Sequence, residues 1–195
     1  MTTAHLLHGF NISNKGRTTT DKLRPYLERI GLRVREMDYG WLGLLGVRLM
    51  NGRLAKRLAA HIAPGDIGVG HSNGCAILAR AADMGAAFSG LVFLNPALDA
   101  DRDIAPAVQW IHVYYNKGDE ATRLSAFLLA HQWGDMGLVG YCGDDPRVRN
   151  YDCSMSLSGH SAIFSKLATW GPVIADNIRL EWMIPPAVGS GVYRA

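Results

Sequence analysis

The sequence predicts an α/β protein, a three-layer sandwich in which a mostly parallel sheet of about six strands lies between helices. Two observations predict it. Short apolar runs alternate with amphipathic segments along the chain, which is typical of a parallel sheet with helical crossovers. Of the 195 residues, 48% are hydrophobic and 19% are charged, which supplies enough apolar surface for one core. We therefore expect one domain over residues 1–184 and an irregular tail over residues 185–195.

Five apolar runs, each followed by Gly or Asn, are predicted to be strands. They cover residues 4–8, 32–39, 66–69, 90–94 and 110–115. The sixth strand is less sharply marked. Residues 136–141 and 147–153 are both expected to form short strands, placed around a turn at residues 143–146, Gly-Asp-Asp-Pro.

Apolar residues at helical spacing predict helices between these runs. In the first helix Leu23, Leu27 and Ile30 share a face, Pro25 lies in the first turn and Gly31 follows the end. The other helices are expected after Val47 up to about residue 62, over about 75–84, from a cap at Asp119 to about 131, and from about 161 to 182. The last should be interrupted at Gly171 and Pro172.

The net charge of +3 conceals an asymmetry along the chain. Residues 1–57 contain eleven Lys and Arg against four Asp and Glu, whereas residues 58–195 contain nine against thirteen. A basic third of a chain can indicate an anionic partner. These cations, however, fall largely on the polar faces of two predicted helices, without aromatic residues between them for base stacking. They are Lys22, Arg24 and Arg29 in the first helix and Arg53, Lys56 and Arg57 in the second. We therefore expect no nucleic-acid partner.

Localisation is predicted from what the sequence lacks. No apolar run approaches the ~18 residues of a membrane-spanning helix, and the first ten residues do not resemble a secretory signal. Three cysteines, at 75, 142 and 153, form no C-x-x-C pair, which fits neither a disulfide framework nor a zinc site. We expect a soluble cytoplasmic protein with reduced thiols, a Cys142–Cys153 disulfide being the less favoured alternative. Nothing in the sequence indicates an oligomeric state.

Residues 70–74, Gly-His-Ser-Asn-Gly, match the pattern G-x-S-x-G. They follow an apolar strand and open a helix, which is the context of a nucleophile elbow with Ser72 exposed at its tip. The alternative is that Ser72 only caps the helix. A serine hydroxyl is a weak nucleophile at neutral pH, so this motif needs a general base and an acid that orients the base.

The predicted acid is Asp119, which comes just after the fifth strand at the carboxyl edge of the sheet. Asp99 and Asp152 are the alternatives. The predicted base is His160, on a loop before the last helix. The expected alternatives, His61, His112 and His131, lie within predicted helices or strands, where structural roles are more common.

Acyl transfer also requires hydrogen-bond donors for the oxyanion. The backbone N–H groups of Asn73, after the nucleophile, and of Phe10, after the first strand, are predicted to supply them. Loops at the carboxyl ends of the strands should line the pocket. One of them, residues 39–47, is strongly apolar and is predicted to hold an acyl chain, touch a lipid surface or pack under the next helix. The predicted substrate-binding residues are Gly9, Asn11, Trp41, Leu42, His71 and Asn95.

These residues, in this order, resemble the α/β-hydrolase superfamily. The matching segments are residues 8–10, His-Gly-Phe, residues 70–74, Asp119 and residues 159–160, Gly-His, and the resemblance extends from residue 4 to about 182. The family's two leading antiparallel strands have no counterpart here. Only residues 95–109 separate the fourth and fifth predicted strands, too few for the cap domain that many members carry. The resemblance therefore implies a minimal, lidless hydrolase fold with an open site.

The resemblance and the three residues together predict a serine hydrolase that acts on a small-molecule acyl substrate, most simply a carboxylic ester. No metal and no organic cofactor is expected. An amidase, thioesterase or acyltransferase with the same triad is an alternative, and so is a non-catalytic binding module on the same fold.

Overall fold

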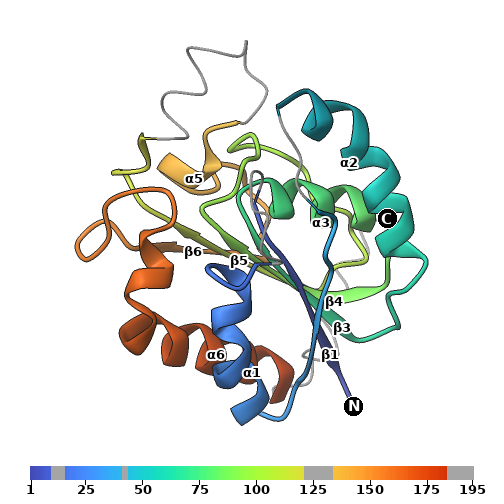
Figure 1. The fold of residues 1–195 in the computed structure, drawn as a ribbon, viewed down its shortest axis with the longest axis horizontal. Coiled ribbons are helices and arrows are strands. Elements are labelled where there is room, and N and C mark those ends of the chain that lie inside the picture. Colours follow the sequence, from blue (N-terminus) through green and yellow to red (C-terminus); the bar gives the residue numbers. More distant parts are fainter. Residues whose placement is uncertain (10–15, 41–43, 121–133, 184–195) are drawn as a thin grey trace, which may run out of the picture.

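Six parallel strands form a single sheet in a computed structural model of the protein (Figure 1), which describes residues 1–9, 16–40, 44–120 and 134–183. Their order across the sheet is β2-β1-β3-β4-β5-β6, and every neighbouring pair is parallel. The strands are β1 (Thr3–Leu7), β2 (Arg33–Glu36), β3 (Asp66–His71), β4 (Phe88–Leu94), β5 (Trp110–Tyr115) and β6 (Val148–Asp152).

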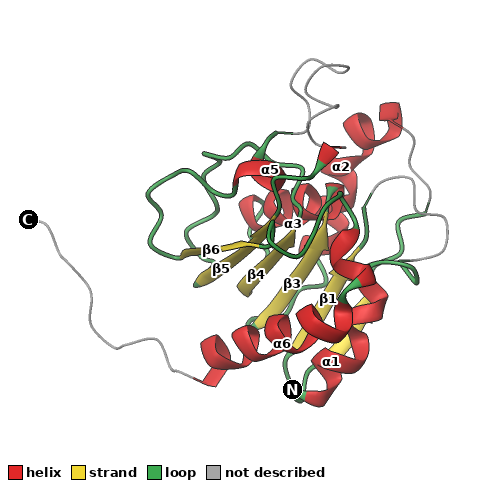
Figure 2. Ribbon diagram, turned by 90° about the vertical axis from the view of Figure 1, so that its left-hand side faces the viewer, coloured by secondary structure: helices red, strands yellow, loops and turns green. Residues whose placement is uncertain are grey.

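Helices cover both faces of this sheet (Figures 1 and 2). The 3₁₀ turn η1 (Thr20–Leu23) leads into α1 (Arg24–Arg29), which packs with α6 (Leu167–Met183) on one face. On the other face lie α2 (Leu44–Ala59), α3 (Asn73–Asp83) and the short α5 (Met136–Val139). A second 3₁₀ turn, η2 (Ala162–Ser165), precedes α6. The three-layer architecture is as predicted.

Two hydrophobic cores result, one on each face of the sheet. Neighbouring residues of β1 show the alternation: Leu6 packs with Leu27 and Ile178 in the α1 and α6 layer, while Leu7 packs in the α2 and α3 layer. Burial on both faces explains why the central strands are continuous apolar runs. All of β3 is buried.

The sixth strand differs from the prediction. Residues 136–139 are helical rather than extended, and β6 pairs in parallel with β5, so residues 143–146 do not connect a hairpin. Tertiary contacts override the local pattern. Met136 is buried and its N–H donates to Leu98 O at 2.9 Å, and the guanidinium of Arg147 donates to the carbonyls of Ile104, Ala105 and Val108, which holds β6 against the start of β5.

The predicted interruption of the last helix at Gly171 and Pro172 is also wrong, since α6 runs through both residues. A Cβ on Gly171 would lie 2.7 Å from the ring of Tyr26 on α1, so this glycine permits close helix packing rather than ending the helix. Ile174 and Ile178, both fully buried, anchor the rest of α6 and offset the hydrogen bond that Pro172 cannot donate.

The helix expected over 119–131 and the tail over 185–195 lie almost wholly or wholly outside the described residues. The chain between β4 and β5, residues 95–109, forms no cap domain. Cys75, Cys142 and Cys153 are free thiols. No helix in the described ranges has the length and apolar character needed to cross a membrane.

Candidate active site

Ser72 lies on a tight turn between β3 and α3, at the carboxyl edge of the sheet. Its backbone has φ 54° and ψ −122°, a strained conformation for a residue with a side chain. Three backbone hydrogen bonds hold it there: its N–H donates to Leu94 O at 3.1 Å, and its carbonyl accepts from the N–H groups of Cys75 and Ala97. The turn therefore has the sharp strand-to-helix backbone predicted for a nucleophile elbow, but Ser72 is only 3% exposed, so the prediction that it lies exposed at the tip of the turn is wrong.

Gly70 and Gly74 make this turn possible because the backbone is crowded on both sides of Ser72. A Cβ on Gly70 would lie 2.8 Å from the N atom of Cys75, and one on Gly74 would lie 2.4 Å from the carbonyl oxygen of Leu7. Side chains at either position would push α3 away from the sheet. The first turn of α3 is thus packed directly against the end of β1.

Asp119 and His160, 41 residues apart in the chain, meet in a hydrogen bond of 2.7 Å between Oδ2 and Nδ1. Asp119 is fully buried, whereas the His160 side chain keeps 21% of its surface exposed. Because the carboxylate oxygen accepts this bond, His160 Nδ1 carries the proton, and in the neutral tautomer Nε2 is the acceptor nitrogen of the ring.

Two asparagines position this pair. The Nδ2 of Asn95 donates to Asp119 Oδ2 at 3.2 Å and also faces Gly137 O, and Asn95 is 1% exposed. On the other side, the Nδ2 of Asn116 donates to the carbonyl of Gly159, directly before His160. Asn95, predicted to contact substrate, is thus buried and hydrogen-bonded to Asp119. Asn116 was not predicted to be a site residue, although its place after β5 matches that of Asn95 after β4.

His71, the residue before Ser72, contacts His160. Its Nε2 donates to the backbone O of His160 at 3.0 Å, and the two rings lie 4.8 Å apart. Phe164 closes the other side of the His71 ring with an edge contact at 5.0 Å. Burial and the neighbouring His160 lower the pKa of His71 to about 3, so this ring stays neutral. His71, expected to contact substrate, is buried and packs His160 in place.

The Ser72 hydroxyl makes no hydrogen bond to a described residue. Such catalytic contacts are often long before substrate binds and tighten in the complex. Ser72 is nevertheless next to His71, whose ring and Nε2 both contact His160. Ser72 and His160 thus lie on adjoining segments of one sheet edge.

The backbone around the predicted oxyanion donors is also ordered by contacts. Asn73 is the first residue of α3, where N–H groups have no acceptor within the helix, and its side-chain amide pairs with that of Asn51 at 2.7 and 3.1 Å. At the end of β1, the hydroxyl of Tyr39 donates to the carbonyl oxygens of His8 and Gly9, at 2.5 and 2.9 Å. The ring of Tyr39 stacks on His8 at 4.1 Å.

Gly9 lies close to the elbow, since a Cβ there would be 3.0 Å from the Cβ of Ser72. Four other predicted site residues, Phe10, Asn11, Trp41 and Leu42, lie outside the described residues. The contacts of Asn51 and Tyr39 at this site were not predicted from the sequence. Both act through contacts between segments distant in the chain, which local pattern does not encode.

The alternatives to Asp119 and His160 lie elsewhere. Asp99 is exposed, and the carboxylate of Asp152 pairs with Lys117 on the surface at 3.2 Å. His112 on β5 bonds to Glu181 at 3.3 Å. Within the described ranges, no group of three His, Cys, Asp or Glu side chains is arranged to hold a metal ion.

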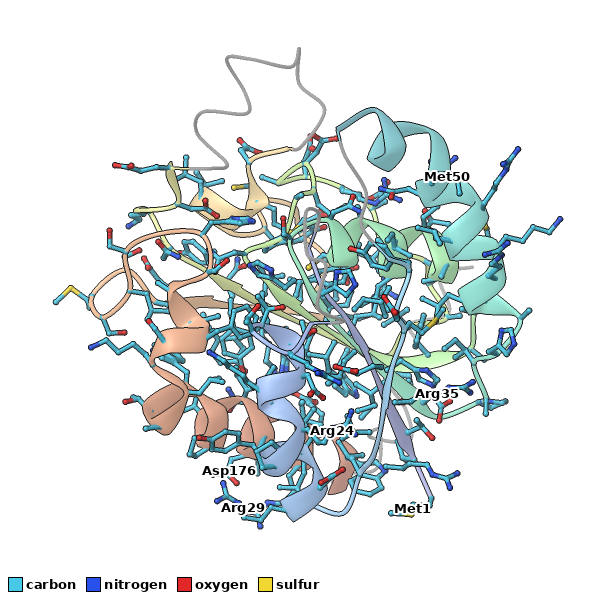
Figure 3. All side chains as sticks on the ribbon, in the orientation of Figure 1. Met1, Arg24, Arg29, Arg35, Met50 and Asp176 are labelled. Carbon is cyan, nitrogen blue, oxygen red and sulfur yellow. The ribbon has the colours of Figure 1, made fainter. Side chains whose placement is uncertain are left out.

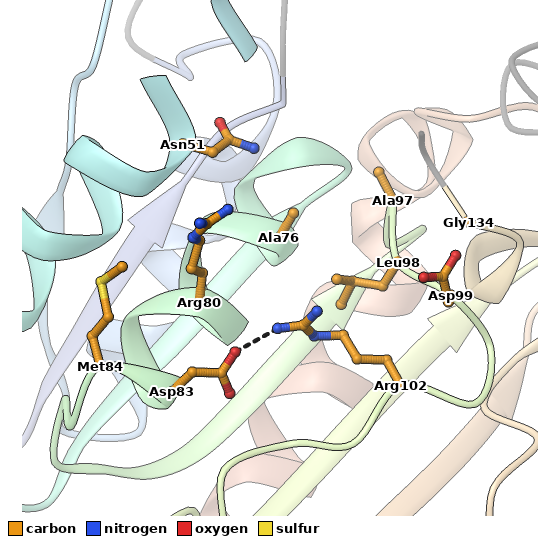
Figure 4. A pocket seen from close by; sticks show the side chains of 10 residues that line it. All are labelled: Asn51, Ala76, Arg80, Asp83, Met84, Ala97, Leu98, Asp99, Arg102 and Gly134. Atoms are coloured by element: carbon orange, nitrogen blue, oxygen red, sulfur yellow. Dashed lines mark hydrogen bonds and ion pairs between the residues drawn. The ribbon is translucent and has the colours of Figure 1, made fainter. Parts of the chain in front are cut away.

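A cavity of about 390 Å³ adjoins the elbow between α2, α3 and the chain after β4 (Figure 4). At one end it is lined by Asn51, the partner of Asn73, and by Ala97, whose N–H donates to Ser72 O. At the other end Asp83 and Arg102 form an ion pair. The groove thus begins beside the elbow and follows α3 away from it.

The chain resembles proteins of known structure in its fold. No family model matches the sequence, and no curated protein matches it. Among solved structures, a protein of the alpha/beta hydrolase superfamily from Xanthomonas campestris is 20% identical, with a TM-score of 0.58, covering 92% of this chain and 99% of its own. A serine hydrolase involved in carbazole degradation is 12% identical, with a TM-score of 0.64 and coverage of 91% of each chain.

An esterase from Pyrococcus furiosus is 13% identical, with a TM-score of 0.61, and the alignment covers 92% of this chain and 82% of the esterase. The likeness spans about nine tenths of this chain in all three cases, including the parallel sheet and the helices on both faces. The protein therefore has the fold of the α/β-hydrolase superfamily.

Proposed function

We propose that the protein is a serine hydrolase that cleaves a carboxylic ester through an acyl-enzyme on Ser72. The observation that carries this proposal is the 2.7 Å bond between buried Asp119 and accessible His160, beside a serine on a strained turn. A helix cap would explain Ser72 alone. It would not explain a buried carboxylate aligned with an imidazole on the neighbouring loop.

In the proposed first step, Ser72 Oγ attacks the ester carbonyl and its proton passes to Nε2 of His160. The negative charge of Asp119 stabilises the imidazolium that forms. The N–H groups of Asn73 and Phe10 would bind the oxyanion, and each such donor typically contributes ~3 kcal/mol in the transition state. His160 then gives its proton to the leaving alcohol, and the acyl group remains on Ser72.

In the second step His160 takes a proton from water, which attacks the acyl-enzyme. The reversed sequence of proton transfers releases the acid and restores the Ser72 hydroxyl. His71 and Asn95 are proposed to act as positioning residues, because they contact His160 and Asp119 rather than solvent. The similarity of fold to an esterase and to a serine hydrolase supports the same reaction class.

The test is steady-state hydrolysis of p-nitrophenyl esters of increasing acyl length, compared with a matched thioester and a p-nitroanilide. Wild-type protein should turn over an ester, and Ser72→Ala should lower kcat by at least ~10³-fold. Ser165→Ala, an exposed serine on η2, is the matched control and should leave kcat unchanged. Faster turnover of the thioester or anilide would reassign the substrate class. Absence of any turnover dependent on Ser72 would favour a binding module.

A further inference from the structure

Tyr39 follows β2, the edge strand that lies beside β1. Because the carboxyl ends of parallel strands meet at one edge of a sheet, this side chain reaches the loop after β1. Its ring stacks on that of His8, with the ring centroids 4.1 Å apart, and its hydroxyl donates to the carbonyl oxygens of His8 and Gly9. No step of the proposed reaction uses Tyr39.

The carbonyl of Gly9 is held by two donors. Its oxygen accepts from His8 Nδ1 at 2.7 Å and from the Tyr39 hydroxyl at 2.9 Å. A carbonyl oxygen has two lone pairs, and both are therefore occupied. The N–H of Phe10 belongs to the same planar peptide group, and in a trans peptide the N–H and the C=O point in opposite directions. Bonds that hold the carbonyl oxygen therefore also orient that N–H group.

This part of the backbone adjoins the elbow. A Cβ on Gly9 would lie 3.0 Å from the Cβ of Ser72, so the backbone of Gly9 packs directly against the Ser72 side chain. A tetrahedral intermediate on Ser72 Oγ would form beside this peptide group. Hydrogen-bond donors at this position are suited to the charge that develops on the substrate oxygen.

The Tyr39 hydroxyl also contacts Asn73, the residue that contains the other predicted donor. Burial raises the pKa of Tyr39, and a hydrogen bond from the Asn73 side chain opposes part of this rise. Since the hydroxyl stays protonated near neutral pH, its proton is shared by the two carbonyls while its oxygen accepts from Asn73. The Asn73 amide is also paired with that of Asn51 on α2. One hydroxyl thus links the first turn of α3 to the loop after β1.

We propose that Tyr39 is a positioning residue that holds the two oxyanion donors, the N–H groups of Asn73 and Phe10, at a fixed separation. The inference rests on the proposed function, because the oxyanion belongs to that reaction. Donors that are held in place before the reaction cost no reorganisation in the transition state. Misplacement near 1 Å can cost about 10²-fold in rate. A role in stability alone would not change the kcat of the folded protein.

The test measures p-nitrophenyl ester hydrolysis by wild-type protein, Ser72→Ala and Tyr39→Phe. Tyr39→Phe keeps the ring on His8 and removes only the hydroxyl. We expect kcat per folded molecule, with the folded fraction taken from circular dichroism, to fall about ten- to a hundredfold while KM changes by less than about twofold. The Ki of a trifluoromethyl ketone, whose adduct with Ser72 carries an oxyanion, should rise by the factor by which kcat/KM falls.

Two further variants make the result specific. Asn73→Ala removes the other end of the link, so its combination with Tyr39→Phe should lose less activity than the product of the two single losses. Tyr26→Phe is the matched control and should leave kcat and Ki unchanged. The ring of Tyr26 on α1 lies under the guanidinium of Arg29, 5.4 Å from it, and Figure 3 shows Arg29 at the opposite end of the molecule from Met50 on α2.

The outcomes separate this inference from the proposed function. If wild-type protein shows no ester turnover that Ser72→Ala abolishes, both are overturned. If turnover depends on Ser72, a wild-type kcat in Tyr39→Phe overturns the inference alone. So does a loss that appears in KM without a change in Ki, an equal loss in Tyr26→Phe, or a double variant whose loss equals the product of the single losses.

Discussion

Replacing Gly74 by Ala should separate α3 from the end of β1 and so disturb the elbow. A Cβ at this position would lie 2.4 Å from the carbonyl oxygen of Leu7 and 2.7 Å from that of His8. Real Cβ atoms essentially never approach closer than 3.0 Å, so the helix and the strand must move apart by at least 0.6 Å, the difference between 3.0 and 2.4 Å. Both atoms are backbone, which leaves no flexible side chain to give way.

This displacement predicts losses of stability and of activity. Overpacking of this kind costs about 1–3 kcal/mol of unfolding free energy, and the better helix propensity of Ala returns at most ~1 kcal/mol. The same movement shifts the N–H of Asn73 relative to the loop after β1. The oxyanion would lie between this N–H group and that loop. Misplacement near 1 Å can cost about 10²-fold in rate, so we expect kcat to fall about ten- to a hundredfold.

The assay compares ester hydrolysis and urea unfolding for Gly74→Ala and Gly52→Ala. Gly52 lies within α2, and the nearest atoms to a Cβ there belong to the guanidinium of Arg80, at 3.6 Å, which is ordinary van der Waals contact. This substitution should raise the unfolding free energy by about 0.5–1 kcal/mol without changing kcat. If Gly74→Ala matched wild type in both stability and kcat, the close packing of α3 on β1 would not be what positions the elbow.

Three further predictions follow from the site and its surroundings. Asp119→Asn should lower kcat about 10³- to 10⁴-fold with little change in KM, because the imidazolium of His160 loses its counter-charge. If circular dichroism showed that the fraction of folded protein falls by the same factor as kcat, Asp119 would have a structural role only. Tyr39→Phe should lower the unfolding free energy by about 1–2 kcal/mol, since two carbonyls lose their donor. The hydroxyl of Tyr26 has no partner among the described residues, so Tyr26→Phe should leave the unfolding free energy unchanged. Unfolding free energy should also fall as pH drops below about 6.5, by up to ~1.4 kcal/mol per pH unit for each buried histidine, and equal values at pH 7.5 and 5.5 by urea titration would contradict this. Burial lowers the pKa of four histidines in the folded state, and the unfolded chain therefore binds protons that the folded chain does not: His5, His8, His71 and His112.

The central strands and the elbow were predictable because local pattern and tertiary packing agree there. A strand buried on both faces has to be apolar, and a turn that lifts a serine between strand and helix needs glycine on either side. Asp119 and His160 were predicted from their place in chain order after Ser72. Their 2.7 Å contact required the fold.

Predictions were wrong where long-range contacts decide the local structure. Residues 136–139 are helical because Met136 packs into the core and hydrogen bonds to Leu98 O, an interaction between segments 38 residues apart in chain numbering. Gly171 and Pro172 have the composition of a helix end, yet the glycine is required by the ring of Tyr26. The positioning contacts of Tyr39, Asn51 and Asn116 likewise join separate loops. A single sequence contains no local signal for such pairs.

The central claim is that Ser72 is a nucleophile activated by His160, and labelling with a fluorophosphonate probe tests it most directly. Native protein, heat-denatured protein, Ser72→Ala and His160→Gln should be treated in parallel and the adduct located by peptide mapping. We predict one adduct, on Ser72, formed only in the native protein and at a greatly reduced rate in His160→Gln. Native protein that remains unlabelled at high probe concentration, or an adduct on another residue, would contradict the claim.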